Sequence, residues 1–390
     1  MRIGIDGMRI GIFENIMTPG GHEVDFDRIL VEELSKLGHK VSFYVPKGFH
    51  FAMNYHVPVQ ELPGDVVSYA GVTGVRKLFR TMQRETRRLG WYRSLFAAGK
   101  RGEVDALIIP TSTYRYLRAL RHSVLRKSKI PVIFILHGIN PKEAPKFLKA
   151  ADALKSCANI RPTVLTFTDS IFGEQRENIR TIYPPTFVPR DISWRPDMQP
   201  SAKKTLTVGF FGQYRREKRL EDFLDVYLAG ESSFARPVQL LVQGSTMHPE
   251  DAEDFERILA KYKGKGGISF LHKGLIGAEW QRAIAEVDVL LMPYSAPRYR
   301  YHWGGMLFTA IGFQKPVITS DDMNPEVFSA YSIGKTFPSG NLDKLKDCLI
   351  DFINTYDREA PHYARALSEA ARAYSPAAFA ERIVGILKDE

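Results

Sequence analysis

Short apolar runs rich in β-branched residues alternate with longer stretches of helical periodicity along almost the whole chain. The first helical stretch places apolar side chains at positions 26, 29, 30, 34 and 37, and Gly38 ends it before the run VSFYV. The runs that follow are DALII, PVIFIL and TVLTF in the first half, and TLTVGFF, VQLLVQ, ISFL, VDVLLMP and PVITS in the second. This alternation predicts an α/β fold with two open parallel sheets, each built like a Rossmann domain.

Two domains also follow from the size of the chain, because 390 residues, 44% of them hydrophobic, exceed the usual size of a single core. Five prolines crowd into the polar stretch YPPTFVPRDISWRPDMQPSAKK between the two sets of runs. Such a stretch is typical of a linker. We therefore place the first domain at residues 1–190, the linker at 191–203 and the second domain at 204–372.

The pentapeptide MRIGI occurs twice near the start, at residues 1–5 and 8–12. The Asp-Gly pair between the copies suits a tight turn, so the copies could pair as a hairpin; alternatively, translation starts at Met8. We favour residues 8–12 as the core strand, because their distance from TPGGHE suits a strand–loop–helix unit. Gly20 and Gly21 would then let backbone approach an anion at a helix N-terminus, or they merely form a turn.

Several classes of site are not indicated by the composition. Only two cysteines occur, Cys157 and Cys348, far apart and without metal-ligand spacing, so neither a disulfide framework nor a zinc site is expected. No G-x-G-x-x-G follows a strand, which makes dinucleotide oxidoreduction a weak hypothesis. The longest apolar run, PVIFIL, is too short to span a bilayer. We expect a cytoplasmic protein without metal or cofactor.

The second half reads, in order, VGFFGQYRREKRLEDFL, LLVQG, ISFLHKGLIGAEWQRAIAEVDVLLMPY and YHWGGMLFTAIGFQKPVITSDDMNPEVF. This series resembles the nucleotide-sugar-binding domain of GT-B glycosyltransferases, especially the retaining family 4, group 1-like enzymes with a Gly-Arg…Lys element and an E-x₇-E element. Upstream, the PGGHE loop and the HG after PVIFIL resemble the N-terminal domain of the same family. The resemblance implies two Rossmann-like domains facing each other across a cleft. It also implies that the last helix, within residues 373–390, packs back on the first domain.

The family motifs are incomplete in this chain. Gln213 stands where the family has Arg, whereas Lys218 keeps the Lys of that element. Tyr301 and Thr309 stand where the two Glu of the E-x₇-E element are expected, so that element is degenerate. In the family these Glu contact the donor sugar and the ribose. We keep Tyr301, Thr309 and Glu326 as candidates for those contacts, although Glu326 could equally face the dipole of its own helix.

Binding of a diphosphate is the part of the resemblance that the sequence preserves best. Lys218 follows a strand, where a cation can neutralise a leaving nucleoside diphosphate, or it belongs to a solvated basic turn. The residues around Gly304 and Gly305 offer backbone N–H groups at a helix start, which suit an anion. The candidate diphosphate ligands are Gly21, Gln213, Arg215, Lys218, Arg298, Arg300, Gly304, Gly305 and Met306. For Arg298 and Arg300 the alternative is stacking on Tyr299 or Tyr301.

Other candidate residues lie at expected strand ends. His137 ends the PVIFIL strand, where the family places a donor-contacting His; otherwise the backbone satisfies it. His22 and Glu23 open the first helix and are candidate bases toward an acceptor hydroxyl, or simple caps. These three are the candidate catalytic residues. By position in the resemblance, Gly244, Gly274 and Leu275 are the candidate nucleobase contacts.

Basic residues are concentrated in the first half of a chain whose net charge is +10. Nine Lys or Arg and the single acid Glu85 lie between Arg76 and Arg101. Apolar residues recur among them at near-helical spacing: Val75, Leu78, Phe79, Met82, Leu89, Tyr92 and Phe96. Residues 74–129 therefore suit an anionic membrane surface, although a solvated helix face packed by its apolar stripe is the alternative. No nucleic-acid motif accompanies the charge, so nucleic acid is not an expected partner.

Together these features predict a glycosyltransferase that moves a sugar from a nucleoside diphosphate sugar to a hydroxyl of a glycan or lipid-linked acceptor. Cell-surface polysaccharide or lipopolysaccharide assembly is the expected setting, in the cytoplasm and at the inner face of the cytoplasmic membrane. Two alternatives stay open. The first is a GT-B sugar-nucleotide epimerase, and the second is a non-catalytic protein that binds nucleotide sugars.

Overall fold

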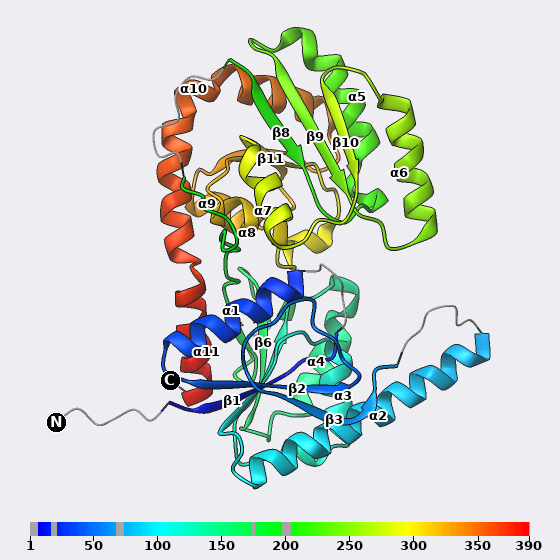
Figure 1. Cartoon of the computed structure of the whole chain (residues 1–390), viewed down its shortest axis with the longest axis vertical. Helices are drawn as coiled ribbons and strands as arrows, with labels where there is room; N and C mark the ends of the chain where they lie inside the picture. Colours follow the sequence, from blue (N-terminus) through cyan, green and yellow to red (C-terminus); the bar gives the residue numbers. More distant parts are fainter. Residues whose placement is uncertain (1–6, 17–21, 68–73, 174–175, 197–203, 390) are drawn as a thin grey trace, which may run out of the picture. The chain divides into compact units, whose positions relative to one another are not determined.

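The computed structural model describes residues 7–16, 22–67, 74–173, 176–196 and 204–389 (Figure 1). The chain forms two compact units, which we describe separately. Unit 1 comprises Met1–Tyr183 and Pro376–Glu390, and unit 2 comprises Pro184–Ser375. The two units divide at Tyr183 and Pro184, before residue 190, where we placed the end of the first domain.

Unit 1 is built on a seven-stranded parallel sheet in the order β3-β2-β1-β4-β5-β6-β7. Its strands are β1 (Arg9–Phe13), β2 (Lys40–Lys47), β3 (Val59–Asp65), β4 (Ala106–Ile109), β5 (Val132–Leu136), β6 (Ile160–Leu165) and β7 (Arg180–Ile182). Its α-helices are α1 (His22–Lys36), α2 (Gly74–Lys100), α3 (Tyr114–Leu120), α4 (Ala144–Asp152) and α11 (Pro376–Lys388). Short 3₁₀ turns lie at Val124–Lys127, Pro141–Glu143 and Ser170–Phe172.

The second MRIGI copy provides the central strand β1, as predicted. This strand pairs with β2 on one side and with β4 on the other, so no edge of β1 is left for a hairpin with the first copy. The first copy, residues 1–5, lies outside the described residues. Helix α1 buries the apolar face that its spacing predicts, from Phe26 to Leu34, whereas Leu37 follows the helix and is 41% exposed.

Helix α11 belongs to unit 1 although it ends the chain. It packs on α1 and also contacts β5 and β7. Phe379 of α11 meets Phe26 of α1 with ring centroids 5.5 Å apart, and the Arg382 guanidinium lies 5.3 Å from the Tyr183 ring. The buried side chains of α11, among them Ile383 and Leu387, therefore close one part of the unit 1 core.

Unit 2 contains a six-stranded parallel sheet in the order β10-β9-β8-β11-β12-β13. Its strands are β8 (Leu206–Phe210), β9 (Val238–Gly244), β10 (Ile268–His272), β11 (Val289–Met292), β12 (Val317–Ser320) and β13 (Gly334–Phe337). Its helices are α5 (Leu220–Gly230), α6 (Pro249–Tyr262), α7 (Gly277–Glu286), α8 (Gly305–Gly312), α9 (Pro325–Ala330) and α10 (Leu342–Ala373). Its 3₁₀ turns are η4 (Arg216–Lys218), η5 (Glu231–Ser233) and η6 (Pro297–Arg300).

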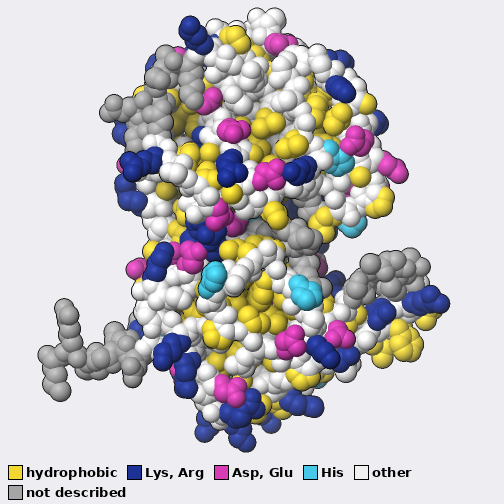
Figure 2. Space-filling view, viewed as in Figure 1, with side chains coloured by type: hydrophobic (Ala, Val, Ile, Leu, Met, Phe, Trp, Pro, Cys, Tyr) yellow, Lys and Arg dark blue, Asp and Glu magenta, His cyan; other side chains and the backbone are white. Residues whose placement is uncertain are grey.

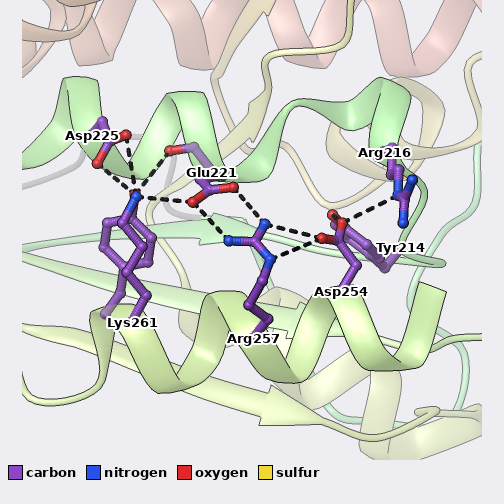
Figure 3. Close-up of polar contacts among 8 residues, drawn as sticks. Tyr214, Arg216, Glu221, Asp225, Asp254, Arg257 and Lys261 are labelled. Carbon is purple, nitrogen blue, oxygen red and sulfur yellow. Dashed lines mark hydrogen bonds and ion pairs between the residues drawn. The ribbon is translucent and has the colours of Figure 1, made fainter. Parts of the chain in front are cut away.

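Charged side chains join α5 to α6 on the outside of unit 2 (Figure 3). Arg257 lies between Glu221 at 2.5 Å and Asp254 at 3.0 Å, and Lys261 adds a bond of 2.9 Å to Glu221. The Arg257 and Lys261 partners lower the pKa of Glu221 to about 2. Arg216 belongs to the same network through an ion pair of 3.6 Å with Asp254, so its guanidinium is directed at α6.

The two parallel sheets confirm the predicted α/β class with two Rossmann-like domains. In the part of the chain that the structure describes, no helix combines the length and the apolar character needed to cross a bilayer.

Candidate functional sites

The candidate diphosphate residues of unit 2 gather at the carboxyl ends of β8 and β11. These two strands are neighbours at the point where the strand order reverses, and ligands of open α/β sheets bind at such a point. The chain after β8 passes through Gly212 into η4, and the chain after β11 passes through η6 into α8. The topology therefore brings two predicted segments, 213–218 and 298–306, to one edge of the sheet.

Lys218 is the buried cation of this site, with 7% of its surface exposed. Its Nζ donates to the Phe211 carbonyl at 3.3 Å and lies 4.9 Å from the Tyr294 ring centroid. A Cβ built on Gly212 would lie 3.3 Å from Nζ and 3.8 Å from the Met306 sulfur, so the ammonium and the start of α8 lie close to the same glycine. Burial, with a smaller contribution from the neighbouring Arg215, lowers the pKa of Lys218 to about 7.

Glu217 organises the remaining basic residues of the site. Its carboxylate accepts from Arg298 and from the Tyr299 hydroxyl, and it lies 3.8 Å from Arg215. The Arg298 guanidinium also lies 5.0 Å from the centroid of the Tyr299 ring, which is the stacking alternative considered above. Gln213 accepts a long bond of 3.4 Å from Arg215. Arg298 is thus already paired, whereas the Arg215 side chain remains 45% exposed.

The start of α8 is fixed by Asn324, a residue that sequence reasoning missed. The Asn324 Oδ1 accepts from the Gly304 N–H at 3.2 Å, and Nδ2 donates to the carbonyls of Tyr299 and His302 at 3.3 and 3.0 Å. A Cβ on Gly304 would meet Oδ1 at 2.8 Å, whereas a Cβ on Gly305 would meet nothing within 4 Å. The N-terminus of α8 therefore has open space beside Gly305, where its N–H groups favour an anion.

The three candidates for sugar and ribose contacts lie in different environments. Tyr301 ends η6 and is half-buried. Thr309 is buried within α8, and its hydroxyl donates to the Gly305 carbonyl at 2.9 Å. Glu326 lies in the first turn of α9 and forms an ion pair of 3.4 Å with Arg300. A candidate for the sugar contacts therefore contacts a candidate for the diphosphate.

The nucleobase candidates lie at the ends of β9 and β10. Gln243, just before Gly244, accepts from the Gly212 N–H at 2.9 Å and donates to the Lys273 carbonyl at 2.5 Å. This single side chain ties the loop after β8 to the loop after β10. Gly274 is exposed and Leu275 is buried beside it. A Cβ on Gly244 would strike the Phe255 ring at 2.5 Å, so this glycine serves close packing of α6 on the sheet.

The three catalytic candidates of unit 1 lie near one another. His137 Nε2 lies 2.9 Å from the Pro110 carbonyl, and its Nδ1 lies 2.9 Å from Nε2 of His22. A carbonyl can only accept, so Nε2 of His137 carries a proton, and in the neutral ring Nδ1 then accepts from His22. The other ring nitrogen of His22 lies 3.7 Å from a Glu23 oxygen. A hydrogen bond therefore joins His137 to His22, and the Glu23 carboxylate lies beside His22 at a distance longer than a hydrogen bond.

Two carboxyl residues that sequence reasoning missed lie next to Glu23. Glu14 directly follows β1, and Asp27 lies one turn after Glu23 in α1. Both are buried, and burial raises the pKa of Glu14 to about 8 and that of Asp27 well above its usual range. The signal was available in the sequence, since an acid directly after a central strand and an acid four residues after Glu23 face the same sheet edge. Gly21 lies outside the described residues.

Helix α2 divides into two parts with different surroundings. Its C-terminal part packs in the core through Trp91, Tyr92 and Leu95. Its N-terminal part exposes four large apolar side chains, each between 62% and 77% accessible: Val75, Leu78, Phe79 and Met82. The predicted exposed stripe is therefore wrong for Tyr92, which is buried, and for Phe96, which packs against the core; its exposed large apolar members lie within residues 75–82. Figure 2 shows apolar and basic side chains side by side at this end of the helix.

Comparisons with known proteins rest on structure. No protein-family model and no curated sequence matches the chain. HepE from Anabaena, solved with UDP and glucose, is 14% identical with a TM-score of 0.67, over 98% of this chain and 100% of its own. A glycosyltransferase from Rickettsia africae is 13% identical with a TM-score of 0.68, over 98% of each chain. WaaG, a glycosyltransferase involved in lipopolysaccharide biosynthesis, is 14% identical with a TM-score of 0.60, over 97% of this chain and 99% of its own. The chain therefore has the two-domain fold of the GT-B glycosyltransferases, as the resemblance predicted.

Proposed function

We propose that the protein is a glycosyltransferase that moves a sugar from a nucleoside diphosphate sugar to a hydroxyl of a glycan or lipid-linked acceptor. The observation that carries this proposal is the meeting of Lys218 and the α8 N-terminus beside Gly212, at the sheet edge where ligands of such folds bind. The fold likeness to HepE, whose crystals contain UDP and glucose, supports the same reaction class.

The chemistry of this site suits departure of a nucleoside diphosphate. Negative charge grows on the diphosphate as the bond to the sugar breaks, and a fixed ammonium with a helix N-terminus stabilises that charge in place of water. We propose that these groups carry the task without a metal or other cofactor. On the acceptor side, we propose that Glu23 and the His22–His137 pair position or accept the proton of the attacking hydroxyl.

Binding of nucleotides to the full chain tests the proposal. We expect one of UDP, GDP, ADP, CMP and TDP to raise the melting temperature, because a ligand that binds only the folded state stabilises it by about 2.7 kcal/mol at a hundred times its Kd. Incubation of the corresponding sugar nucleotide with and without glycan acceptors then separates the alternatives. Release of product only with an acceptor supports transfer, isomerised donor without an acceptor supports an epimerase, and binding without turnover supports a binding protein.

We also propose that the N-terminal part of α2 binds an anionic membrane surface, at the inner face of the cytoplasmic membrane where a lipid-linked acceptor for polysaccharide or lipopolysaccharide assembly would lie. Residues 75, 78, 79 and 82 lie on one face of the helix, and Arg76 and Arg80 flank them. Exposed apolar side chains next to Arg suit the boundary between lipid headgroups and acyl chains.

Replacement of Leu78 and Phe79 by Glu should lower binding to vesicles that contain phosphatidylglycerol by about 100-fold. Each of these side chains contributes roughly 1.5–3 kcal/mol when fully buried, and the new charges repel anionic lipid. Co-sedimentation with vesicles measures the effect, with Gln83→Glu, an exposed polar position on the same helix, as the control. Equal sedimentation of wild type and double variant would show that this end of α2 does not contact lipid.

A further inference from the structure

Unit 1 contains a cavity of about 240 Å³ that none of the proposed roles uses in full. It lies between the end of β1, the first turns of α1 and the loop that follows β2. Three carboxyl residues line one part of it, Glu14, Glu23 and Asp27, and three aromatic residues line another, Phe49, Phe51 and Tyr55. An acidic part and an aromatic part therefore share one partly open cavity.

Glu14 and Asp27 are buried, whereas Glu23 is partly buried and has an oxygen 3.7 Å from Nδ1 of His22. Glu14 and Asp27 are 2% and 3% exposed. Each of the three carboxyls has an oxygen without a hydrogen-bond partner among the described residues, and these are Oε2 of Glu14, Oε2 of Glu23 and Oδ1 of Asp27. Among the described residues that line the cavity there is no lysine or arginine, and the basic side chain present is the exposed His50. Burial of an unpaired carboxylate costs several kcal/mol, so Glu14 and Asp27 favour the protonated form.

The residues around Glu14 and Asp27 do not place a positive charge beside these carboxyls. Arg28 of α1 is near enough to Tyr55 to lower its pKa, but it forms an ion pair of 2.7 Å with Glu32 on the same helix. The Tyr55 hydroxyl donates to the Val24 carbonyl at 3.0 Å, and the other Glu14 oxygen accepts from two backbone N–H groups, of Asn15 and Ile16, at 2.6 Å each. The raised pKa of Glu14 has burial as its main cause, and the Glu23 carboxylate adds to it. Among the described residues, Glu14 and Asp27 thus have no positively charged partner.

The aromatic part of the cavity determines the kind of cation. Phe51 packs against Phe49 at 4.9 Å and against Tyr55 at 5.2 Å between ring centroids, so the wall is a continuous aromatic surface. Aromatic rings attract organic cations and pack against apolar faces of small molecules. Among the described residues, no group of three or more His, Cys, Asp or Glu is arranged to hold a metal ion. An organic ammonium therefore fits the cavity better than a metal ion does.

We propose that this cavity is an acceptor subsite that recognises a protonated amino group on a sugar unit, through Glu14, Glu23 and Asp27, with the sugar ring against Phe51 and Tyr55. The inference rests on the proposed function, because it names the class of acceptor that a glycosyltransferase with this first domain would take. Binding of the ammonium displaces protons from the carboxyls, which become the anionic partners of the ammonium.

Titration calorimetry of the full chain with glucosamine tests the proposal, with glucose and N-acetylglucosamine as neutral analogues. We expect glucosamine to bind at least about tenfold more tightly than either analogue, which corresponds to about 1.4 kcal/mol. Repeating the titration at pH 7 in phosphate and in MOPS, which differ in ionisation enthalpy, should reveal a release of up to about one proton per bound glucosamine. Asp27→Asn and Glu14→Gln should each remove the preference for glucosamine, whereas Glu61→Gln, at an exposed position of β3, should not change it.

Three results would overturn the proposal: glucose binding as tightly as glucosamine, an unchanged preference in both carboxyl variants, or no binding of glucosamine by the wild type. The nucleotide experiment separates this inference from the proposed function, because it depends on unit 2. If a nucleotide stabilises the protein and glucosamine does not bind, only the amino-sugar subsite fails. If glucosamine binds and no nucleotide does, the transfer reaction fails and the subsite stands.

Discussion

Replacing Lys218 by methionine should slow the release of nucleoside diphosphate from the sugar donor by about 10²–10³-fold, the usual effect of removing one group that stabilises developing charge. Lys218 is the buried cation next to Gly212 and the α8 start, so the variant removes positive charge where the diphosphate is proposed to lie. Methionine keeps an unbranched apolar chain against the Tyr294 ring, which limits loss of packing. Product release is measured with the donor that the nucleotide experiment identifies.

The same substitution should leave unit 2 equally or more stable, which distinguishes a functional role from a structural one. Burial lowers the pKa of Lys218 from 10.5 to about 7, so the unfolded chain binds this proton more tightly than the folded chain does. The lysine therefore destabilises the fold below pH 7, and its contribution improves as the pH rises from about 7 toward 10.5. At neutral pH, each kcal/mol relieved in the variant should raise the melting temperature by about 2–4 °C.

Nucleotide affinity should also depend on this pKa. Wild-type affinity for the diphosphate should fall as the pH rises above about 7, because Lys218 loses its proton in the free protein. Lys218→Met should bind weakly at every pH, and Arg216→Met, which removes a charge directed at Asp254, should keep the wild-type profile. A less stable Lys218→Met with unchanged affinity would assign the lysine to packing alone.

The central strands were predictable because they are buried on both faces. Runs such as PVIFIL and VDVLLMP became β5 and β11, where every side chain is buried. Three strands were missed, β3, β7 and β13, and each lies at the edge of its sheet. β3 has the sequence VQELPGD, with five of seven residues exposed, so its sequence lacks the apolar run of a buried strand. Such edge strands form because they pair with a neighbouring strand, and the hydrophobic pattern of their own sequence does not indicate them.

Site residues were predictable from the sequence where their position after a strand is enough to place them. They were less predictable where their role depends on a partner far away in the sequence. Lys218 follows from its position after β8, and the sheet edge brings it to the α8 start. The pairing of Arg298 with Glu217 joins residues 81 positions apart, so no local spacing indicates it. Glu14 and Asp27 were missed because a carboxyl is usually exposed, and only the fold shows that both are buried.

Asn324 should be the polar side chain on which the start of α8 most depends, and Asn324→Ala should destabilise unit 2 by about 2–4 kcal/mol. The residue is 1% exposed, with φ 39°, a left-handed conformation that Asn tolerates better than Ala. Its removal takes one hydrogen bond from the buried Gly304 N–H and one from each of the partly buried Tyr299 and His302 carbonyls. For a unit of this size, a melting temperature lower by about 4–16 °C is expected.

Two further substitutions separate the conformational and hydrogen-bonding contributions of Asn324. Asn324→Gly removes the same three bonds but accepts the positive φ, so it should be about 1 kcal/mol more stable than Asn324→Ala. Asn324→Asp keeps the acceptor for the Gly304 N–H, but it buries a carboxylate and turns one of its oxygens toward the Tyr299 and His302 carbonyls, so it should be less stable than Asn324→Gly. The rise in melting temperature that a bound nucleotide causes should decline with the stability of the variant, because the bonds of Asn324 hold η6 against the N-terminus of α8. If all three variants melt like the wild type and bind nucleotide equally, the α8 start is held by other contacts, and the anion site depends on Lys218 alone.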